Sequence, residues 1–104
     1  MDNDDLQVDG GVLYVNKDLR QDFDLAFDES CNELLASQTD ALTINLGAVS
    51  YINSTYIGMI AATYFQAQSM NKSLKVIARP AVLAILKSAG FDGFIRLEPC
   101  DPAE

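Results

Sequence analysis

Residues 53–58, NSTYIG, contain the side chains best suited to chemistry in this sequence. Ser54 and Thr55 each carry a hydroxyl that could accept a phosphoryl group, and Asn53 carries an amide that could cap a helix. The sequence contains no His, which removes the usual general base and the commonest metal ligand. The pattern therefore favours binding or modification over hydrolytic chemistry.

The two cysteines, Cys31 and Cys100, lie far apart and form no Cys-x-x-Cys pair, so neither a disulfide framework nor a zinc site is predicted. Cys31 falls on the apolar side of a predicted helix and is interpreted as core, whereas any redox role of Cys100 stays open. The sequence also lacks a glycine-rich phosphate loop. We therefore expect no catalytic residue, no cofactor and no metal, and the chain is not expected to be an enzyme.

Acidic residues dominate the first part of the chain. Fifteen acidic against seven basic residues give a net charge of −8, which argues against nucleic acid as a partner. Residues 1–40 hold 11 acids and 2 bases (2 − 11 = −9), whereas residues 41–104 hold 4 acids and 5 bases (5 − 4 = +1). No charge occurs from Ala41 to Asn71. A helix in that stretch must expose an uncharged face, which predicts a docking surface for a protein.

The length of 104 residues and the hydrophobic content of 49% suit one domain over 1–104, with an acidic leader (1–5) and a short tail (99–104). No stretch approaches the roughly 20 apolar residues of a membrane helix, and the first residues are acidic where a secretory signal would be basic. We therefore expect a cytoplasmic protein without direct membrane insertion.

Segments rich in β-branched and aromatic residues predict strands over 6–8, 11–16, 42–46, 74–78 and 94–97. The Asp9-Gly10 pair predicts a hairpin between the first two strands. Asp18 and Gln21 have the spacing of a capping box, which predicts a helix that runs to about Ser37.

Two further helices are predicted over Ser54–Ser69 and from Pro80 to Gly90. Apolar residues at helical spacing predict their buried faces: Ile57, Ile60, Ala61, Tyr64 and Phe65 in one, and Val82, Ile85, Leu86 and Ala89 in the other. A strand-helix-strand unit requires a parallel pair. The sequence thus predicts an α/β fold with a mixed, mostly parallel central sheet of four to five strands and about three helices.

The segment Leu42–Gly58, LTINLGAVSYINSTYIG, resembles the signature of STAS domains. In that signature a strand ending in Asp-Leu leads by a short turn to Asp-Ser-Ser/Thr-Gly-Leu at the start of a helix. Here Asn45-Leu46 matches the first pair and residues 53–58 match the second element. The order and spacing of the later elements also resemble this family over nearly the whole chain.

This resemblance, to the anti-sigma factor antagonists among STAS proteins, implies a partner-switching role. The partner it implies is a serine/threonine kinase that doubles as an anti-sigma factor; phosphorylation on the first motif serine breaks the complex, and a PP2C-type phosphatase restores it. By position that serine is Ser54, with Thr55 as the fallback. Asn53, Ser54, Thr55, Tyr56 and Gly58 would then contact the partner, and the protein would be a monomer or a weak dimer.

The sequence departs from the motif at three positions. Asn45 and Asn53 replace aspartates, and Tyr56 replaces a glycine, where its ring would serve as a binding anchor or cover the sheet edge. Residues at a helix start can also be plain caps, with Asn53 as the cap. The alternative function is a constitutive STAS subunit of an ABC-type phospholipid-trafficking transporter, or a signalling scaffold, without phosphorylation.

Overall fold

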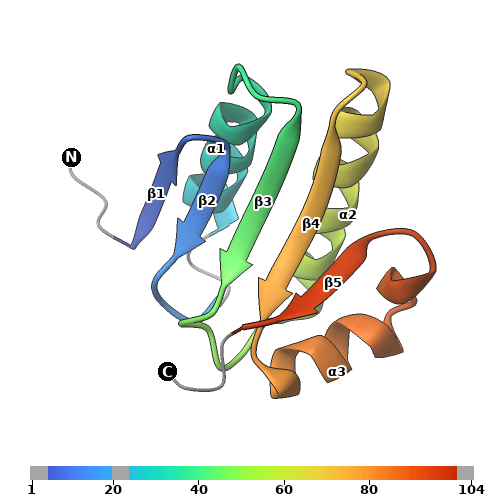
Figure 1. The fold of residues 1–104 in the computed structure, drawn as a ribbon. Helices are drawn as coiled ribbons and strands as arrows, with labels where there is room; N and C mark the ends of the chain where they lie inside the picture. Colours follow the sequence, from blue (N-terminus) through green and yellow to red (C-terminus); the bar gives the residue numbers. More distant parts are fainter. Residues whose placement is uncertain (1–4, 20–23, 101–104) are drawn as a thin grey trace.

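The computed structural model describes residues 5–19 and 24–100, which form an α/β fold (Figure 1). In chain order the elements are β1 (Leu6–Asp9), β2 (Val12–Val15), α1 (Asp24–Leu35), β3 (Ala41–Leu46), α2 (Ser54–Ser69), β4 (Ser73–Ala78), α3 (Pro80–Ser88), the 3-10 turn η2 (Phe91–Gly93) and β5 (Arg96–Pro99). The predicted fold class, with three helices and a mixed, mostly parallel sheet, is confirmed.

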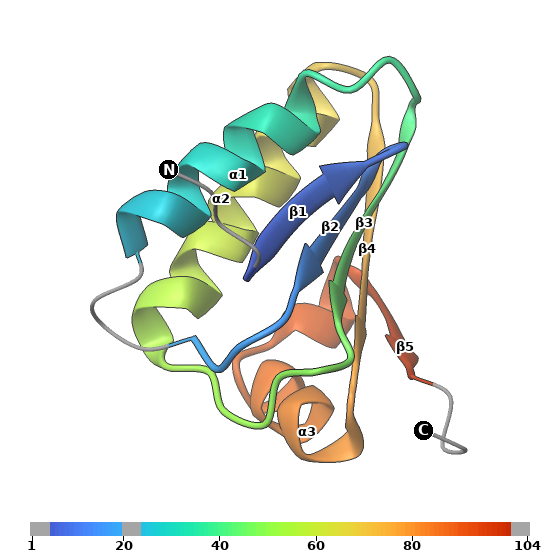
Figure 2. The ribbon, with the colours of Figure 1, turned by 90° about the vertical axis from the view of Figure 1, so that its left-hand side faces the viewer.

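The five strands form one sheet in the order β1-β2-β3-β4-β5. β1 pairs antiparallel with β2, and every later pair is parallel. From β2 to β5, each connection leads to the neighbouring strand, always toward the same edge of the sheet. Because parallel crossovers are almost always right-handed, this order places the helices on one side of the sheet. Figure 2 shows α1, α2 and α3 on that side.

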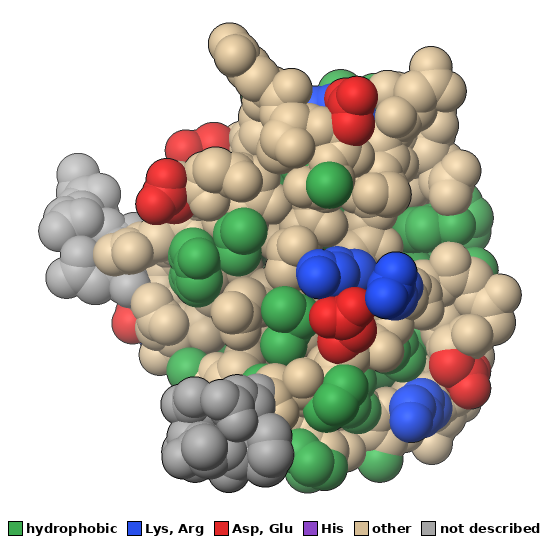
Figure 3. Space-filling view, viewed as in Figure 1, with side chains coloured by type: hydrophobic (Ala, Val, Ile, Leu, Met, Phe, Trp, Pro, Cys, Tyr) green, Lys and Arg blue, Asp and Glu red, His purple; other side chains and the backbone are tan. Residues whose placement is uncertain are grey.

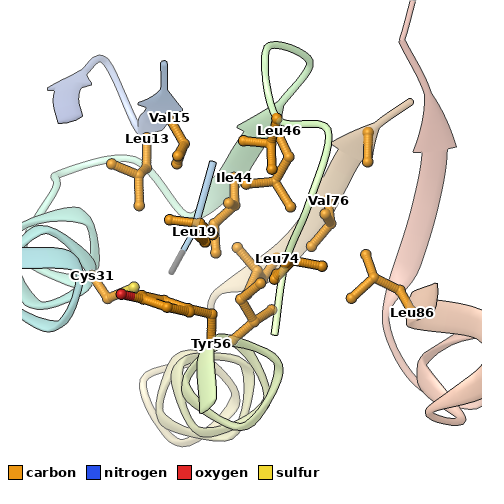
Figure 4. Packing of buried hydrophobic residues seen from close by; sticks show 14 of the residues in the cluster. Leu13, Val15, Leu19, Cys31, Ile44, Leu46, Tyr56, Leu74, Val76 and Leu86 are labelled. Carbon is orange, nitrogen blue, oxygen red and sulfur yellow. The ribbon is translucent and has the colours of Figure 1, made fainter. Parts of the chain in front are cut away.

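The core lies between the helices and the sheet. In β3 the side chains of Leu42, Ile44 and Leu46 are buried and alternate with less buried neighbours, as a strand with one covered face requires. The buried side chains of β3 and β4 gather above α2 (Figure 4). This packing fixes the position of α2 relative to the sheet.

The opposite face of the sheet carries no helix among residues 5–19 and 24–100 (Figure 2), and Figure 3 shows the side chains on this face. Basic side chains gather there around an acidic one, and Glu98 accounts for this cluster. Its carboxylate lies 3.3 Å from Lys75 Nζ and 2.9 Å from Arg96 Nε. These ion pairs are partly exposed and add little to stability, because solvent screens them.

The hairpin turn lies one residue later than the sequence predicts. Asp9 pairs with Val12, so the turn residues are Gly10 and Gly11. Both have positive φ, 61° and 83°, as a two-residue turn of the favoured twist requires. The Asp9-Gly10 pair therefore identified the hairpin but placed its turn one residue too early.

The first predicted helix ends near the expected position, and Gln21 of its predicted capping box lies outside the described residues. The Asp18 carboxylate accepts hydrogen bonds from the backbone N–H and the hydroxyl of Ser50. At the other end, Lys72 Nζ donates to the carbonyl oxygens of Leu35, at 2.8 Å, and Ser37. The last turn of α1 has no basic residue of its own, so Lys72 satisfies carbonyls that the helix leaves free.

The last strand also begins later than predicted. Residues 91–93 form η2, Phe94 lies outside the sheet, and β5 runs from Arg96 to Pro99. Phe94 packs against the aromatic rings of Tyr64 and Phe65. Pro99, expected to begin the tail, instead lies opposite Ala78 in the parallel pair of β4 and β5.

The buried face of α2 differs from the predicted one. Its buried residues are Tyr56, Ile60, Thr63 and Ala67, which share one side of the helix. Of the predicted stripe only Ile60 is buried; Ile57, Ala61 and Tyr64 are half-buried, and Phe65 is exposed. Because α2 is apolar on most sides, hydrophobic spacing alone did not identify the face toward the sheet.

Candidate functional site

Asn53 caps the N-terminus of α2. Its backbone is extended (φ −101°, ψ 174°), and its side-chain oxygen accepts hydrogen bonds from the N–H groups of Thr55, at 3.0 Å, and Tyr56, at 3.3 Å. The Asn53 carbonyl accepts the first helical bond from the Ile57 N–H at 3.2 Å. These bonds satisfy orphan donors of the first turn, so the capping interpretation of Asn53 is confirmed.

Ser54 and Thr55 are exposed at the start of α2. In the part of the chain that the structure describes, neither hydroxyl makes a hydrogen bond. Ser54 is the first helical residue, and a helix N-terminus favours negative charge because its free N–H groups point outward. A phosphate on Ser54 would therefore sit in a favourable field, and the hydroxyl is reachable from solvent.

Tyr56 does not reach the surface, which corrects the prediction that it contacts a partner. Its side chain is fully buried. The ring meets Phe27 of α1 edge-on, with centroids 5.4 Å apart and an interplanar angle of 83°, and points toward Cys31 (Figure 4). Tyr56 neither anchors a partner nor caps the sheet edge; it fills the space between α1, α2 and the sheet.

Gly58 lies one turn into α2 and is exposed. A Cβ added there would meet no atom within 4 Å, so the structure does not require glycine for space, and its φ is not positive. Glycine in a helix interior costs about 0.5–1 kcal/mol relative to alanine. Gly58 therefore leaves the surface beside Ser54 and Thr55 without a side chain, and it lowers the stability of the helix.

Two side chains accept hydrogen bonds that brace the loop leading from β3 into α2. Asp18 accepts from the Ser50 N–H at 2.7 Å and from the Ser50 hydroxyl at 2.9 Å. Asn45 accepts from the Gly47 N–H at 2.9 Å. The Asp18–Ser50 contact joins residues 32 apart, so no local sequence pattern could have predicted it. Together these bonds hold the loop that sets the position of Ser54.

The helix that begins at Ser54 carries no charged residue along its whole length. α2 has no acidic residue in its first turn and no basic residue in its last turn. The neighbouring helix α1, in contrast, exposes Asp28, Glu29 and Glu33. A single phosphate on Ser54 would add about −1.5 to −2 charges to a helix that otherwise has none.

A protein-family model described as "Mlab, STAS domain" matches residues 3–98. The chain belongs to the STAS domain family. Comparison with curated protein sequences gives no match.

Two solved structures resemble this STAS domain closely in fold. An anti-sigma factor antagonist from Mycobacterium paratuberculosis is 25% identical, with a TM-score of 0.74 over 89% of this chain and 81% of that one. A candidate anti-sigma factor antagonist from Thermotoga maritima is 16% identical, with a TM-score of 0.75 over 94% of this chain and 86% of that one. The second likeness shows the shared fold alone.

The two asparagines of the STAS motif keep the acceptor role that an aspartate would have. Asn45 and Asn53 each accept a backbone N–H through the side-chain oxygen. A Cβ on Gly47 would lie 3.0 Å from the Asn45 oxygen, so that turn is tight. The substitutions therefore preserve the local backbone and remove negative charge on both sides of the turn into α2.

The cysteines differ in environment. Cys31 is buried, and desolvation raises the pKa of its thiol from the ordinary 9.0 to about 11. A hydrogen bond with Thr63 lowers this pKa, and the negative charge of Asp28 raises it. Cys100 is half-buried and lines a shallow hollow of about 530 Å³ beside Asn45 and Arg79.

No group of three His, Cys, Asp or Glu side chains within 5–19 and 24–100 could hold a metal ion. Among these residues, no helix has the length and apolar character to cross a membrane.

Proposed function

We propose that this STAS domain is an anti-sigma factor antagonist whose binding to an anti-sigma factor kinase is controlled by reversible phosphorylation of Ser54. It acts as a cytoplasmic binding protein without catalysis of its own, and a PP2C-type phosphatase reverses the modification. The resemblance of its motif and its likeness to an anti-sigma factor antagonist that is 25% identical support this role.

The observation that carries the proposal is the environment of the Ser54 hydroxyl. It is exposed, makes no hydrogen bond within the described chain, and stands at the N-terminus of a helix without charged residues. Asn53, Thr55 and Gly58 adjoin it and are at least partly exposed. A partner could therefore cover this surface closely, and a phosphate would oppose that contact by charge and by the cost of desolvating it.

The chemical step would be an ordinary phosphoryl transfer. A bond forms between Ser54 Oγ and the γ-phosphorus of ATP, the bond from that phosphorus to the ADP oxygen breaks, and the hydroxyl proton leaves to a base of the kinase. Hydrolysis by the phosphatase would return the hydroxyl and release inorganic phosphate. No residue of this chain is required as a catalyst for either step.

The test incubates the protein with ATP and a candidate anti-sigma factor kinase from the same organism, followed by intact-mass and fragment mass spectrometry. We expect one added phosphoryl group on wild type and none on Ser54→Ala. Ser69→Ala is the matched control, because Ser69 lies on the same uncharged helix at its other end and is also exposed. We expect Ser69→Ala to be phosphorylated like wild type.

Binding provides the second half of the test. We expect unmodified wild type to bind the kinase, and Ser54→Asp to bind it at least about tenfold more weakly, equivalent to about 1.4 kcal/mol. Phosphorylation confined to Thr55 would move the switch to the fallback residue. Absence of phosphate at both positions would refute the switch.

A second candidate is a constitutive STAS subunit of an ABC-type phospholipid-trafficking transporter, or a scaffold. Two observations favour it: the matching family model bears the Mlab description, and asparagines stand at both motif aspartate positions. This role predicts stable co-purification with an ATPase, with affinity unchanged after incubation with kinase and ATP.

A further inference from the structure

The side chain of Asn53 is held in one orientation by the helix that it caps. Its oxygen accepts the N–H groups of Thr55, at 3.0 Å, and Tyr56, at 3.3 Å. An asparagine amide carries an oxygen that accepts hydrogen bonds and an NH₂ group that donates two. Because the oxygen is bound to the first turn of α2, the NH₂ group points away from these two backbone groups. Within residues 5–19 and 24–100, this NH₂ group makes no hydrogen bond.

The Ser54 hydroxyl stands directly after this cap in the chain. It is exposed and likewise makes no hydrogen bond to the residues that the structure describes. The sequence from Ala41 to Asn71 contains no Lys or Arg, so no cation adjoins Ser54 in the chain to neutralise a phosphate. Asn53 therefore offers two unused N–H donors beside the position where a phosphate on Ser54 would lie.

We propose that Asn53 sets the balance of the Ser54 switch, because its amide favours the phosphorylated form, which an aspartate at this position would disfavour. This inference rests on the proposed function, since it concerns the regulation of the same serine. Asn53 takes no part in the phosphoryl transfer itself. Its role is to change the relative stability of the two forms.

The argument depends on the difference between an amide and a carboxylate of the same shape. An aspartate would accept the same two backbone N–H groups, but it has no hydrogen to donate and carries a negative charge. Beside a phosphate of about −1.5 to −2 charges, that carboxylate would repel the phosphate, and both groups would compete for the positive end of α2. The amide instead donates to the phosphate, and hydrogen bonds to an ionised acceptor are stronger than neutral ones.

The substitution Asn53→Asp should therefore have opposite effects in the two forms. In the unmodified domain it keeps the cap and adds favourable charge at the helix start, so it should be at least as stable as wild type. In the phosphorylated domain it places two negative groups side by side, so it should be less stable than phosphorylated wild type. A purely capping role of Asn53 predicts the same effect in both forms.

The test uses the full chain with phosphoserine introduced at position 54 during translation, so that no kinase is needed. Urea unfolding at about pH 8, where the phosphate carries close to two charges, gives the folding equilibrium constants of wild type and Asn53→Asp with and without the phosphate. We expect phosphorylation to lower the constant of Asn53→Asp at least about fivefold more than that of wild type. Residues 53 and 54 are also adjacent in the unfolded chain, so this ratio reports only the interaction that the folded cap creates.

Asn45→Asp is the matched control, because it adds the same charge at a similar backbone contact. The Asn45 oxygen accepts the Gly47 N–H at 2.9 Å. Ile44 and Leu46 are buried under the helices, so Asn45 between them faces the opposite side of the sheet from α2. We expect phosphorylation to change the folding constant of Asn45→Asp by the same factor as that of wild type.

NMR of the side-chain amides provides a readout that capping alone would not move. We expect the NH₂ signals of Asn53 to shift on phosphorylation of Ser54, and their exchange with water to slow. Unchanged NH₂ signals would overturn the inference. So would an equal effect of phosphorylation on wild type and Asn53→Asp, or an equal loss in Asn45→Asp. A kinase that leaves Ser54 unmodified would refute the proposed function but not this coupling, so the two failures are distinguishable.

Discussion

Ser54 and Tyr56, two positions apart in the first turn of α2, occupy opposite environments. Residues two apart on a helix point about 200° away from each other, so a buried Tyr56 directs Ser54 toward solvent. The Tyr56 ring is held by Phe27, which fixes the rotation of the helix about its axis. Tyr56, which departs most from the STAS motif, therefore helps to expose the hydroxyl of Ser54, which matches the motif.

The side chain of Asn53 is expected to stabilise the domain through its two hydrogen bonds. Asn53→Ala removes the acceptor for the N–H groups of Thr55 and Tyr56, and should lower the free energy of unfolding by about 1 kcal/mol. Asn53→Asp keeps the acceptor and adds negative charge at the helix N-terminus, and should raise that free energy by about 0.3–1 kcal/mol. Urea denaturation monitored by circular dichroism measures both changes.

Varying the salt concentration tests whether the stabilisation by Asn53→Asp comes from its charge. The gain over wild type should shrink in about 1 M salt, where the screening length falls to roughly 3 Å, whereas the loss in Asn53→Ala should persist. If Asn53→Ala and wild type had equal free energies of unfolding, water would replace the cap at no energetic cost. Asn53 would then not determine where α2 begins.

Helix α2 is apolar on its buried side and uncharged on its exposed side. Its buried face of Tyr56, Ile60, Thr63 and Ala67 fixes it to the sheet. The exposed face then presents Ser54 at one end and Phe65 at the other. Ser54 and Phe65 are therefore both exposed on one helix.

Gly58→Ala is expected to separate the stability of α2 from its binding role. The added methyl group meets open space, so the free energy of unfolding should rise by about 0.5–1 kcal/mol through helix propensity alone. If a partner packs closely against this turn, the same methyl group should weaken binding to the anti-sigma factor kinase several-fold. Thermal or urea unfolding measures the first effect, and titration calorimetry with the kinase measures the second.

The matched control for this prediction is Ala62→Gly, on the same exposed side of α2 one turn later. It should lower stability by about the amount that Gly58→Ala raises it, with no effect on kinase binding. Unchanged kinase affinity in Gly58→Ala would indicate that the partner does not approach the first turns of α2, and would move the docking surface elsewhere.

The order of elements could be predicted from local signals in the sequence. Strand-like runs, the Asp9-Gly10 pair, Pro80 at a helix start and the uncharged stretch after Ala41 are each local, and each corresponds to an element or surface in the structure. The STAS resemblance likewise depended on a continuous motif, Leu42–Gly58. Ser54 was placed correctly at the first position of α2 because its environment is set by the helix cap beside it.

The features that were predicted wrongly depend on contacts between distant residues. Phe94 has strand propensity but joins rings from α2. Tyr56 was judged by its exposed place in the motif, whereas its burial depends on Phe27 of α1. In each case tertiary packing overrides a local preference that spacing alone expresses.

At the scale of the whole molecule, Cys31 reports on the packing of both long helices against the sheet. Its thiol belongs to α1 and hydrogen-bonds Thr63 of α2, and desolvation by burial is the main reason that its pKa rises from 9.0 to about 11. In the unfolded chain the thiol ionises near pH 9. Unfolding therefore releases a proton between about pH 9 and pH 11, so the neutral thiol stabilises the fold below pH 9, and this contribution declines as pH rises.

The free energy of unfolding of wild type should thus fall with pH above 9 at up to about 1.4 kcal/mol per unit until pH 11, from the ionisation of Cys31 alone. Cys31→Ala should be less stable at pH 7, because it leaves a small cavity, but should lose stability less steeply above pH 9. The two proteins differ only at position 31, so the difference between the two curves isolates the contribution of Cys31. Urea unfolding at intervals from pH 7 to pH 11 provides these curves. If they run parallel through this range, the thiol is not desolvated, and α1 and α2 do not pack over it as the structure has them.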